Sequence, residues 1–302
     1  MALSALAVAT LLGFVIRELL AAEPILDLTV FADRNFAASS LAILLVALGF
    51  NSSLLLVAIY TQQVLGYDAW SSGLTLAPGG VGTLIALMIS GRLVSRMDQR
   101  LMLLAGCVGQ GFALWLMTQV TSTMDFWSLA WPRFIQGFSQ GFIFVPLQAL
   151  SLATVTTERL GNATSGYNML RNIGGSLGVA VATAMLARRS QYHQVALVGR
   201  LDPYSPAMDE RLRDWTAHFV AHGADTFTAS RRAMAMVYRE AVTQAHILAY
   251  ADVFWLMLAA YVAVLFLIPF MRRVRSGQGR GGGVRRARNR RRAITRLPAP
   301  AD

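Results

Sequence analysis

The chain has no lysine, a single cysteine and few charged residues. Charged residues make up 14% of its 302 residues and hydrophobic residues 55%, which is too apolar for one soluble domain. All 27 basic residues are arginine, which we attribute to a GC-rich coding sequence and from which we infer no function. Because Cys107 stands alone inside an apolar block, an internal disulfide is excluded and the redox compartment cannot be inferred.

Histidine is also scarce, and none of the four histidines lies in a predicted membrane span. No paired carboxylates or metal ligands converge within the spans, so we predict no enzyme, no catalytic residue and no cofactor. Asp214, His218 and His222 follow one another at helical spacing, but no further ligand completes a metal shell. We interpret them as a solvated helix face and predict no metal site.

Apolar residues come in blocks of about 20, the length that an α-helix needs to cross the hydrocarbon core of a bilayer. The sequence therefore predicts an all-α polytopic membrane protein with seven transmembrane helices. The predicted spans are 3–20, 38–62, 72–92, 102–121, 127–150, 165–187 and 249–271.

Arginine is unevenly distributed between the loops. Short cytoplasmic loops are enriched in positive charge, so the arginine-rich side and the tail are expected in the cytoplasm. Arg188 and Arg189 lie on the opposite side, but they open a long loop, where this rule weakens. The short loops on the other side, 63–71 and 122–126, contain no arginine, whereas the cytoplasmic side contains Arg34, Arg92, Arg96, Arg100, Arg159 and eleven arginines after residue 271.

The span 127–150 carries polar residues along one stripe. Arg133, Gln136 and Gln140 project to one side of the helix, and Gln148 lies further along. Polar groups at this depth are costly unless they face protein or water. We interpret the stripe as a cavity wall that contacts substrate or relays a conformational change. A satisfied structural hydrogen-bond network is the alternative.

The last six spans form two groups of three with matching polarity. The first span of each group carries internal polar residues, the second is glycine-rich and the third is apolar nearly all round. We expect the first to line a cavity, the second to pack closely against a partner and the third to face lipid. Asn51 and Gln62 are the cavity candidates in span 38–62, although a hydrogen bond between helices explains Asn51 more simply.

Four segments resemble the major facilitator superfamily. Gly91–Arg100 resembles its loop signature, but Ser95 stands where the family has an aspartate, and Pro132–Gly141 resembles its Arg-x-x-Gln-Gly helix motif. Arg171–Ala180 and Gln244–Phe254 are similar to the closing part of the EmrB/QacA-type fourteen-helix drug:proton antiporters. The candidate gating residues within these and neighbouring motifs are Gly91, Arg92, Arg96, Asp98, Arg100, Arg171, Gly174 and Gly178.

The resemblance covers only the C-terminal half of that family. It implies one six-helix half bundle, built as a 3+3 repeat, plus one preceding helix, in the inner membrane of a bacterium. It further implies multidrug efflux by alternating access, with a missing N-terminal transporter half, small hydrophobic or amphipathic compounds and membrane lipids as partners. The acidic residues near the spans lie at span ends, so the proton-coupling carboxylate is expected in the missing half. A truncated, non-transporting membrane subunit or interaction protein is the alternative.

Glycine pairs and one arginine carry two interpretations each. Gly137 with Gly141, and Gly174 with Gly178, are spaced so that helix backbones can approach closely, and a gating role is secondary to this packing. Arg171 either pairs with a carboxylate of the missing half or extends to the headgroups.

The chain divides into a linker region (1–35), the bundle (36–271) and a tail (272–302). The loop 188–248 should contain a helix with Ser205 as its cap, Pro206 as its first residue and Gly223 after its end. We expect a hairpin that rests on the outer mouth or, as the resemblance implies, docks a periplasmic adaptor protein. The arginine-rich tail should be disordered and bind anionic lipid, and no nucleic acid is expected because the tail has no aromatic residue. The apolar stripe of the predicted helix is Met208, Leu212, Trp215 and Phe219.

Overall fold

The computed structural model describes residues 28–199 and 205–271, together with residues 10, 13 and 17. Within these ranges the chain is helical and has no strand, which confirms the predicted all-α class. The predicted first span (3–20) and the tail (272–302) lie outside the continuous described ranges. The helices are α2 (Arg34–Gln63), α3 (Ala69–Leu93), α4 (Gln99–Met117), α5 (Phe126–Leu152), α6 (Leu160–Val198), α7 (Pro206–Ala221) and α8 (Thr226–Leu267), with 3-10 turns η1 (Leu28–Ala32), η2 (Thr157–Arg159) and η3 (Ile268–Phe270).

Six of the predicted spans coincide with long helices. Of the described helices, α2, α3, α4, α6 and α8 are long and apolar enough to cross a membrane. The remaining one, α5, has 27 residues and the required length, but it carries the polar stripe that begins at Arg133. Arg133, Gln136 and Gln140 are buried, so α5 is a central helix of the bundle.

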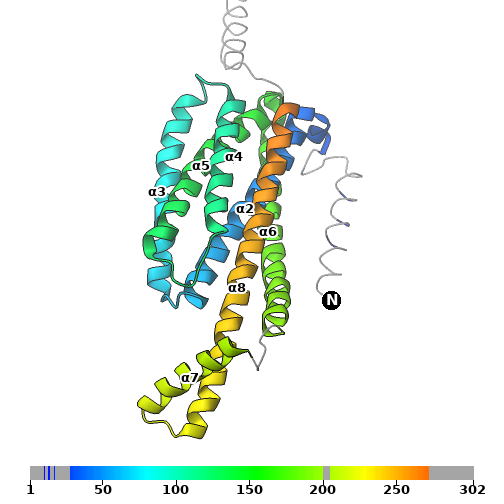
Figure 1. Cartoon of the computed structure of the whole chain (residues 1–302). Helices are drawn as coiled ribbons and strands as arrows, with labels where there is room; N and C mark the ends of the chain where they lie inside the picture. Colours follow the sequence, from blue (N-terminus) through cyan, green and yellow to red (C-terminus); the bar gives the residue numbers. More distant parts are fainter. Residues whose placement is uncertain (1–9, 11–12, 14–16, 18–27, 200–204, 272–302) are drawn as a thin grey trace, which may run out of the picture.

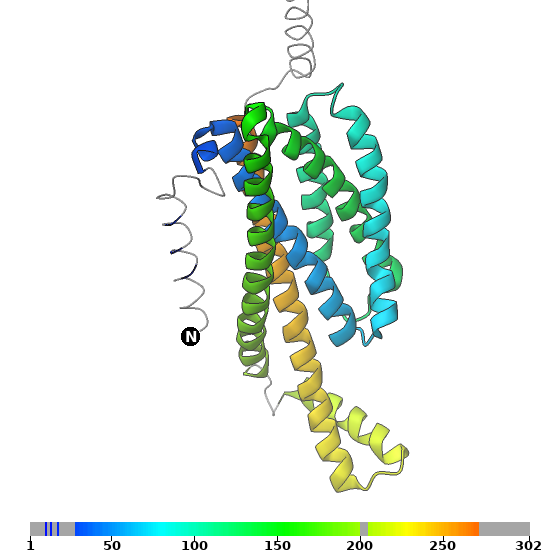
Figure 2. The same cartoon turned by 180° about the vertical axis from the view of Figure 1, so that it is seen from behind.

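The two groups of three helices pack in the same pattern. In the first group, α3 packs along α5 of the second, and in the second group α6 packs along α2 of the first. Likewise α4 packs on α5, and α8 packs on α2. Figures 1 and 2 show α3 and α4 on one side of the bundle and α6 and α8 on the other, with α2 and α5 running obliquely between them. The helices α2, α3 and α4 correspond to α5, α6 and α8. Each of these contacts therefore has an equivalent contact in the other group, as a 3+3 repeat requires.

The third helix of each group is apolar on two faces. We predicted that α4 and α8 would face lipid, and α4 exposes large apolar side chains such as Phe112 on one face. On its opposite face α4 buries Leu103 and Leu114, and α8 buries Tyr250 and Phe254. An apolar core face and an apolar outer face cannot be distinguished by composition.

Aspartates begin five of the helices. Each cap carboxylate accepts a backbone N–H of the first turn, which satisfies a donor that the helix cannot pair itself. Side-chain and backbone hydrogen bonds from Ser71, Ser128 and Thr228 hold the pKa of Asp68, Asp125 and Asp225 below its usual value. Several acids that the sequence placed at span ends are therefore structural caps. The cap residues of α2, α3, α4, α5 and α8 are Asp33, Asp68, Asp98, Asp125 and Asp225.

The segment 188–248 is largely a continuation of two helices. α6 extends to Val198 and α8 begins at Thr226, so both project beyond the other helices, and α7 packs on α8 there (Figure 1). As predicted, Ser205 caps α7 by accepting the backbone N–H of Met208, and Gly223 follows its end with a φ of +87°. We call residues 205–248 the α7–α8 hairpin and that end of the bundle the hairpin end; the opposite end, with Arg34 and Arg159, is the basic end.

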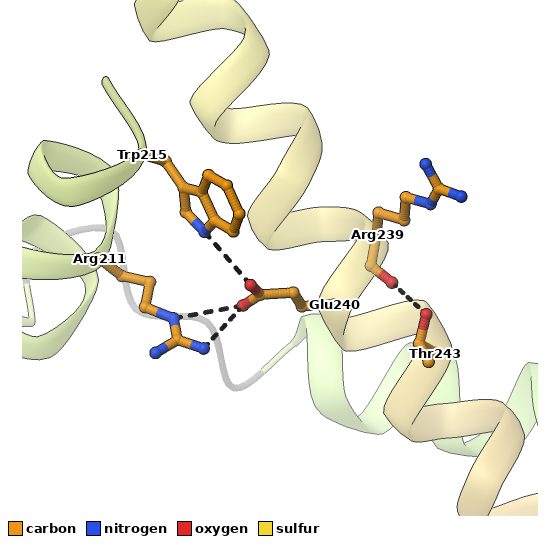
Figure 3. A network of polar contacts seen from close by, with 5 residues as sticks. All are labelled: Arg211, Trp215, Arg239, Glu240 and Thr243. Atoms are coloured by element: carbon orange, nitrogen blue, oxygen red, sulfur yellow. Dashed lines mark hydrogen bonds and ion pairs between the residues drawn. The ribbon is translucent and has the colours of Figure 1, made fainter. Parts of the chain in front are cut away.

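Glu240 holds the hairpin together. Its Oε2 lies 3.1 Å from Nη2 and 3.2 Å from Nε of Arg211, and its Oε1 accepts a hydrogen bond of 3.2 Å from the Trp215 indole (Figure 3). Met208 is buried, and Trp215 is half-buried. The apolar stripe of α7 thus packs on α8. The hairpin projects past the end of this bundle (Figure 1), and its placement on the outer mouth of a complete transporter stays a prediction.

Candidate functional site

The polar stripe of α5 lies inside the bundle. Arg133 is 2% exposed, and Gln136 and Gln140 are 0% exposed. Nη1 of Arg133 donates to Oε1 of Gln136, and Nε2 of Gln136 donates to the Ser53 hydroxyl of α2 at 2.8 Å. This contact joins the first helices of the two groups. The burial favours the alternative of a hydrogen-bond network over an open cavity wall.

The network is not fully satisfied. Within the described part of the chain, neither side-chain amide atom of Gln140 has a hydrogen-bond partner. Nε of Arg133 is also buried without a partner there. A buried unpaired polar group costs about 1–3 kcal/mol. No hydrogen bond within the described bundle offsets this cost for Gln140. It remains a candidate for the relay role.

An open pocket lies on the face formed by α2 and α6. Its volume is about 640 Å³, and it combines apolar side chains with a few polar ones. Asn51 and Arg171, both predicted from the sequence, line it and are exposed. Among the described residues, the hydrogen bond found for Asn51 is within its own helix, where Nδ2 donates to the carbonyl of Ala47 at 3.0 Å. The lining residues are Ala47, Phe50, Asn51, Phe144, Arg171, Asn172, Gly175, Ser176 and Val179.

The other two cavity candidates lie elsewhere. Gln62 is exposed near the hairpin end of α2, where its Nε2 donates to the Ser72 hydroxyl at 3.4 Å. Gln148 is exposed near the other end of α5. Neither lines the pocket, so the structure divides the six predicted cavity residues between the bundle interior, the pocket and the helix ends.

The glycine pairs allow close helix contacts, as predicted. A Cβ atom added at any of the four would overlap the neighbouring helix, on α3 for the pair of α5 and on α2 for the pair of α6. These are the two equivalent contacts of the repeat. The partners are Gly79 for Gly137, Ala86 for Gly141, Leu44 for Gly174 and Leu48 for Gly178.

The loop candidates lie together between α3 and α4 at the basic end. Gly91, Arg92 and Arg96 are exposed, and Arg100 is half-buried. Asp98 caps α4 by accepting the backbone N–H of Arg100 at 3.1 Å. The Ser95 hydroxyl donates to the Arg92 carbonyl at 3.3 Å, so it stabilises the turn locally.

Sequence reasoning missed a polar cluster between α6 and α8. Nε2 of His193 lies 2.8 Å from Oδ2 of Asp252, and Nε of Arg189 lies 3.5 Å from the same oxygen. The Ser190 hydroxyl lies 3.2 Å from Nδ1 of His246. His193 and Asp252 are 59 residues apart, so neither segment signals the pairing. The available signal was an aspartate inside a predicted span, because an acid at that position needs a partner.

The two sides of the bundle differ in chemistry. Both the α3–α4 side and the α2–α6 side expose large apolar side chains, such as Met88 and Leu177, and the α2–α6 side also exposes Asn51 and Arg171 around the pocket. Long apolar helices with apolar outer faces define a multi-pass membrane protein, and the polar groups at the pocket suit contact with protein or water. The description Major Facilitator Superfamily matches residues 3–179, more than half of the chain, and the chain belongs to this superfamily. Its members are transporters and not enzymes.

Curated relatives extend the similarity beyond that match. The chain is 28% identical to the multidrug export protein EmrB of Escherichia coli K12 over 286 residues, which cover 93% of this chain and 54% of that protein. It is 27% identical to the fatty acid resistance protein FarB of Neisseria gonorrhoeae over 270 residues, covering 89% and 51%. With the uncharacterized MFS-type transporter EfpA of Mycobacterium tuberculosis it shares 31% identity over 192 residues, covering 62% and 36%. The chain spans about half the length of the first two.

Proposed function

We propose that this chain is the C-terminal six-helix half of a secondary active exporter of small hydrophobic or amphipathic compounds. It would work by alternating access together with an N-terminal half, in the same or a separate polypeptide. The observation that carries the proposal is the pocket on the α2–α6 side, whose largely apolar lining includes exposed polar groups. Arg171, Asn172 and Ser176 would be costly against lipid, so this side is suited to a water-filled path shared with a second bundle.

The pocket suits the compounds that the relatives' names suggest. Phe50, Phe144 and Val179 offer an apolar surface, and Arg171 is the one charged side chain in its lining. A multidrug export protein and a fatty acid resistance protein are among the relatives. We therefore place half of the substrate path here, with the α5 network behind it as the candidate relay.

The proposal includes an orientation and further partners. The basic end and the tail would face the cytoplasm of a bacterium, so the hairpin end would face outward. Coupling to protons is proposed for the complete transporter. A periplasmic adaptor remains a proposed partner of the α7–α8 hairpin. The surface proposed for it is a largely apolar groove of about 590 Å³, lined by Met208 and Leu212 of the α7 stripe together with Met234 and Tyr238 of α8.

Efflux measurements with two polypeptides test this function. The chain is expressed in an efflux-deficient bacterium, alone and with an N-terminal half supplied separately, and protonophore-sensitive export of a hydrophobic dye is measured. We expect export only with both halves, because a single bundle has no opposite wall to move against. Arg171→Ala should lower export about tenfold, as expected for the loss of one charged contact. Phe112→Leu on the lipid side is the matched control and should leave export unchanged.

Two results would contradict the proposal. Protonophore-sensitive export by the lone chain would show that no second half is needed. No export from the two halves, with both present in the membrane and copurifying, would favour a non-transporting membrane subunit.

A further inference from the structure

Asp252 stands apart from the other described acids. Within the described helices α2 to α6 and α8, the acidic residues are Glu240 and Asp252, both on α8. Glu240 lies in the hairpin, where Arg211 and Trp215 bind it. Asp252 lies inside the predicted span 249–271. An ionisable group at this depth is expected to have both a partner and a function.

Two basic side chains from the facing helix converge on this carboxylate. Nε2 of His193 lies 2.8 Å from Oδ2 of Asp252, and Nε of Arg189 lies 3.5 Å from the same oxygen. The side chains of His193, Asp252 and Arg189 are 18%, 33% and 43% exposed. The cluster is therefore open enough to exchange protons with the medium at the hairpin end, yet shielded enough for its charges to interact.

The chemistry of the pair depends on the protonation state of the histidine. Imidazole is the side chain that gains a charge within the range of about pH 5 to 8. A neutral ring can donate one hydrogen bond to Asp252, whereas a charged ring forms a charge-assisted bond that is roughly twice as strong. Arg189 partly neutralises the carboxylate in both states, so the variable contribution comes from His193.

We propose that His193 and Asp252, supported by Arg189, form a proton-binding site that joins α6 to α8, and that proton uptake by His193 tightens this contact. Proton binding here does not require transport, whereas its use in coupling rests on the proposed function. Because α8 continues without interruption from Asp252 into the hairpin, the site also fixes the base of the α7–α8 hairpin.

The surrounding groups leave this role to His193. His246 is hydrogen-bonded to Ser190, and Glu240 is paired with Arg211. Among the described residues, the ion pairs of Asp252 are those with Arg189 and His193. Other titratable or charged groups on the helices packed around the pair include Arg188 and Tyr192 on α6, Tyr250 on α8, Tyr60 on α2, Cys107 on α4, and Arg211 on α7.

The pH dependence has a definite sign. If the closed contact prefers charged His193, the contact is strongest when the ring is protonated and weakens as the pH rises through the range in which histidine titrates. In the proposed orientation the outer medium sets this state. A purely structural hydrogen bond from a neutral ring would show no such dependence.

A double-mutant cycle at two pH values tests the proposal. His193→Gln, Asp252→Asn and the double variant of the 302-residue chain are prepared in lipid nanodiscs, and thermal unfolding is measured at about pH 5.5 and about pH 8. We expect the coupling between positions 193 and 252 to be about twofold greater at the lower pH. The cycle of Ser190→Ala with His246→Gln is the matched control. His218→Gln, on the exposed face of α7, should leave the coupling between positions 193 and 252 unchanged at both pH values.

A distance measurement keeps the test independent of stability. Spin labels at the exposed positions Val195 on α6 and Leu248 on α8 report the separation of the two helices. We expect a narrower distance distribution at about pH 5.5 than at about pH 8, and we expect His193→Gln to abolish the difference. Equal coupling at both pH values, or an unchanged distribution, would overturn the site. Neither measurement depends on export, so failure of the proposed function would be recognised separately.

Discussion

At the scale of single residues, two glutamines one turn apart on α5 have opposite surroundings. Gln136 binds both Arg133 and Ser53, whereas Gln140 binds no group in the described part of the chain. Both are 0% exposed. Their identical burial and different pairing make them a matched pair for separating stability from function.

We predict opposite effects on stability from the same substitution. Gln136→Met leaves the buried guanidinium of Arg133 without its partner and should destabilise the bundle by about 1–3 kcal/mol. Gln140→Met removes an unpaired amide at similar volume and should be neutral or stabilising. Thermal unfolding in detergent measures both. A destabilised Gln140→Met variant would show that this amide is paired in the folded protein, and lost export with full stability would support the relay role.

At the scale of elements, glycines determine which helices touch. The contact of α3 with α5 depends on Gly79 and Gly137, whose backbones meet, and the contact of α2 with α6 depends on Gly174 and Gly178. Helices in a membrane associate largely through such close packing, because lipid offers apolar surfaces as good as those of another helix. The same kind of glycine contact between helices therefore occurs twice in the repeat.

We predict that one methyl group at this contact is sufficient to weaken the bundle. Gly137→Ala would place a Cβ atom on the backbone of Gly79, and the resulting overpacking should cost about 1–3 kcal/mol. Gly80→Ala on α3 adds the same group where no atom lies within 4 Å, and it should not destabilise. Thermal unfolding of the two variants compares them directly. Equal stability would mean that α3 and α5 are further apart than in this structure.

At the scale of the whole molecule, the short connections at the two ends of the bundle differ in their arginine content. Arg34, Arg92 and Arg159 lie at the basic end, and the connections at the hairpin end between α2 and α3 and between α4 and α5 contain no arginine. The short connections are thus asymmetric in arginine, which is the basis of the proposed orientation. The extended parts of α6, α7 and α8 at the hairpin end do carry arginine, namely Arg188, Arg189, Arg211, Arg213, Arg231, Arg232 and Arg239.

Cysteine labelling measures this orientation. In a background with Cys107→Ser, single cysteines at Ser122 and Gly199 should react with a membrane-impermeant maleimide added to intact cells. Cysteines at Ser95 and Ser276 should react only after the membrane is opened. Protection of position 199 in intact cells, with position 95 accessible, would show the opposite topology. The proposed proton site would then face the cytoplasm instead of the outer medium.

The sequence by itself determined the elements that local physics controls. Long apolar blocks predicted the long helices, and the cap and stop signals of Ser205, Pro206 and Gly223 predicted α7 closely. Glycine spacing predicted the close contacts, because a missing side chain has the same meaning in any fold that brings two helices together. Polarity along the helices indicated that one side of the bundle avoids lipid, although it did not separate Asn51, which lines the pocket, from Gln140, which is buried.

Only the tertiary structure decided which side chains meet. The pairing of His193 with Asp252 joins residues from α6 and α8, and the binding of Trp215 by Glu240 turns an apparently free apolar stripe into an internal contact. Which face of α4 is buried and which is exposed also depended on its neighbours. Interactions between helices depend on their rotation and mutual approach, which are set by packing over the whole bundle and are not encoded in the periodicity of any one segment.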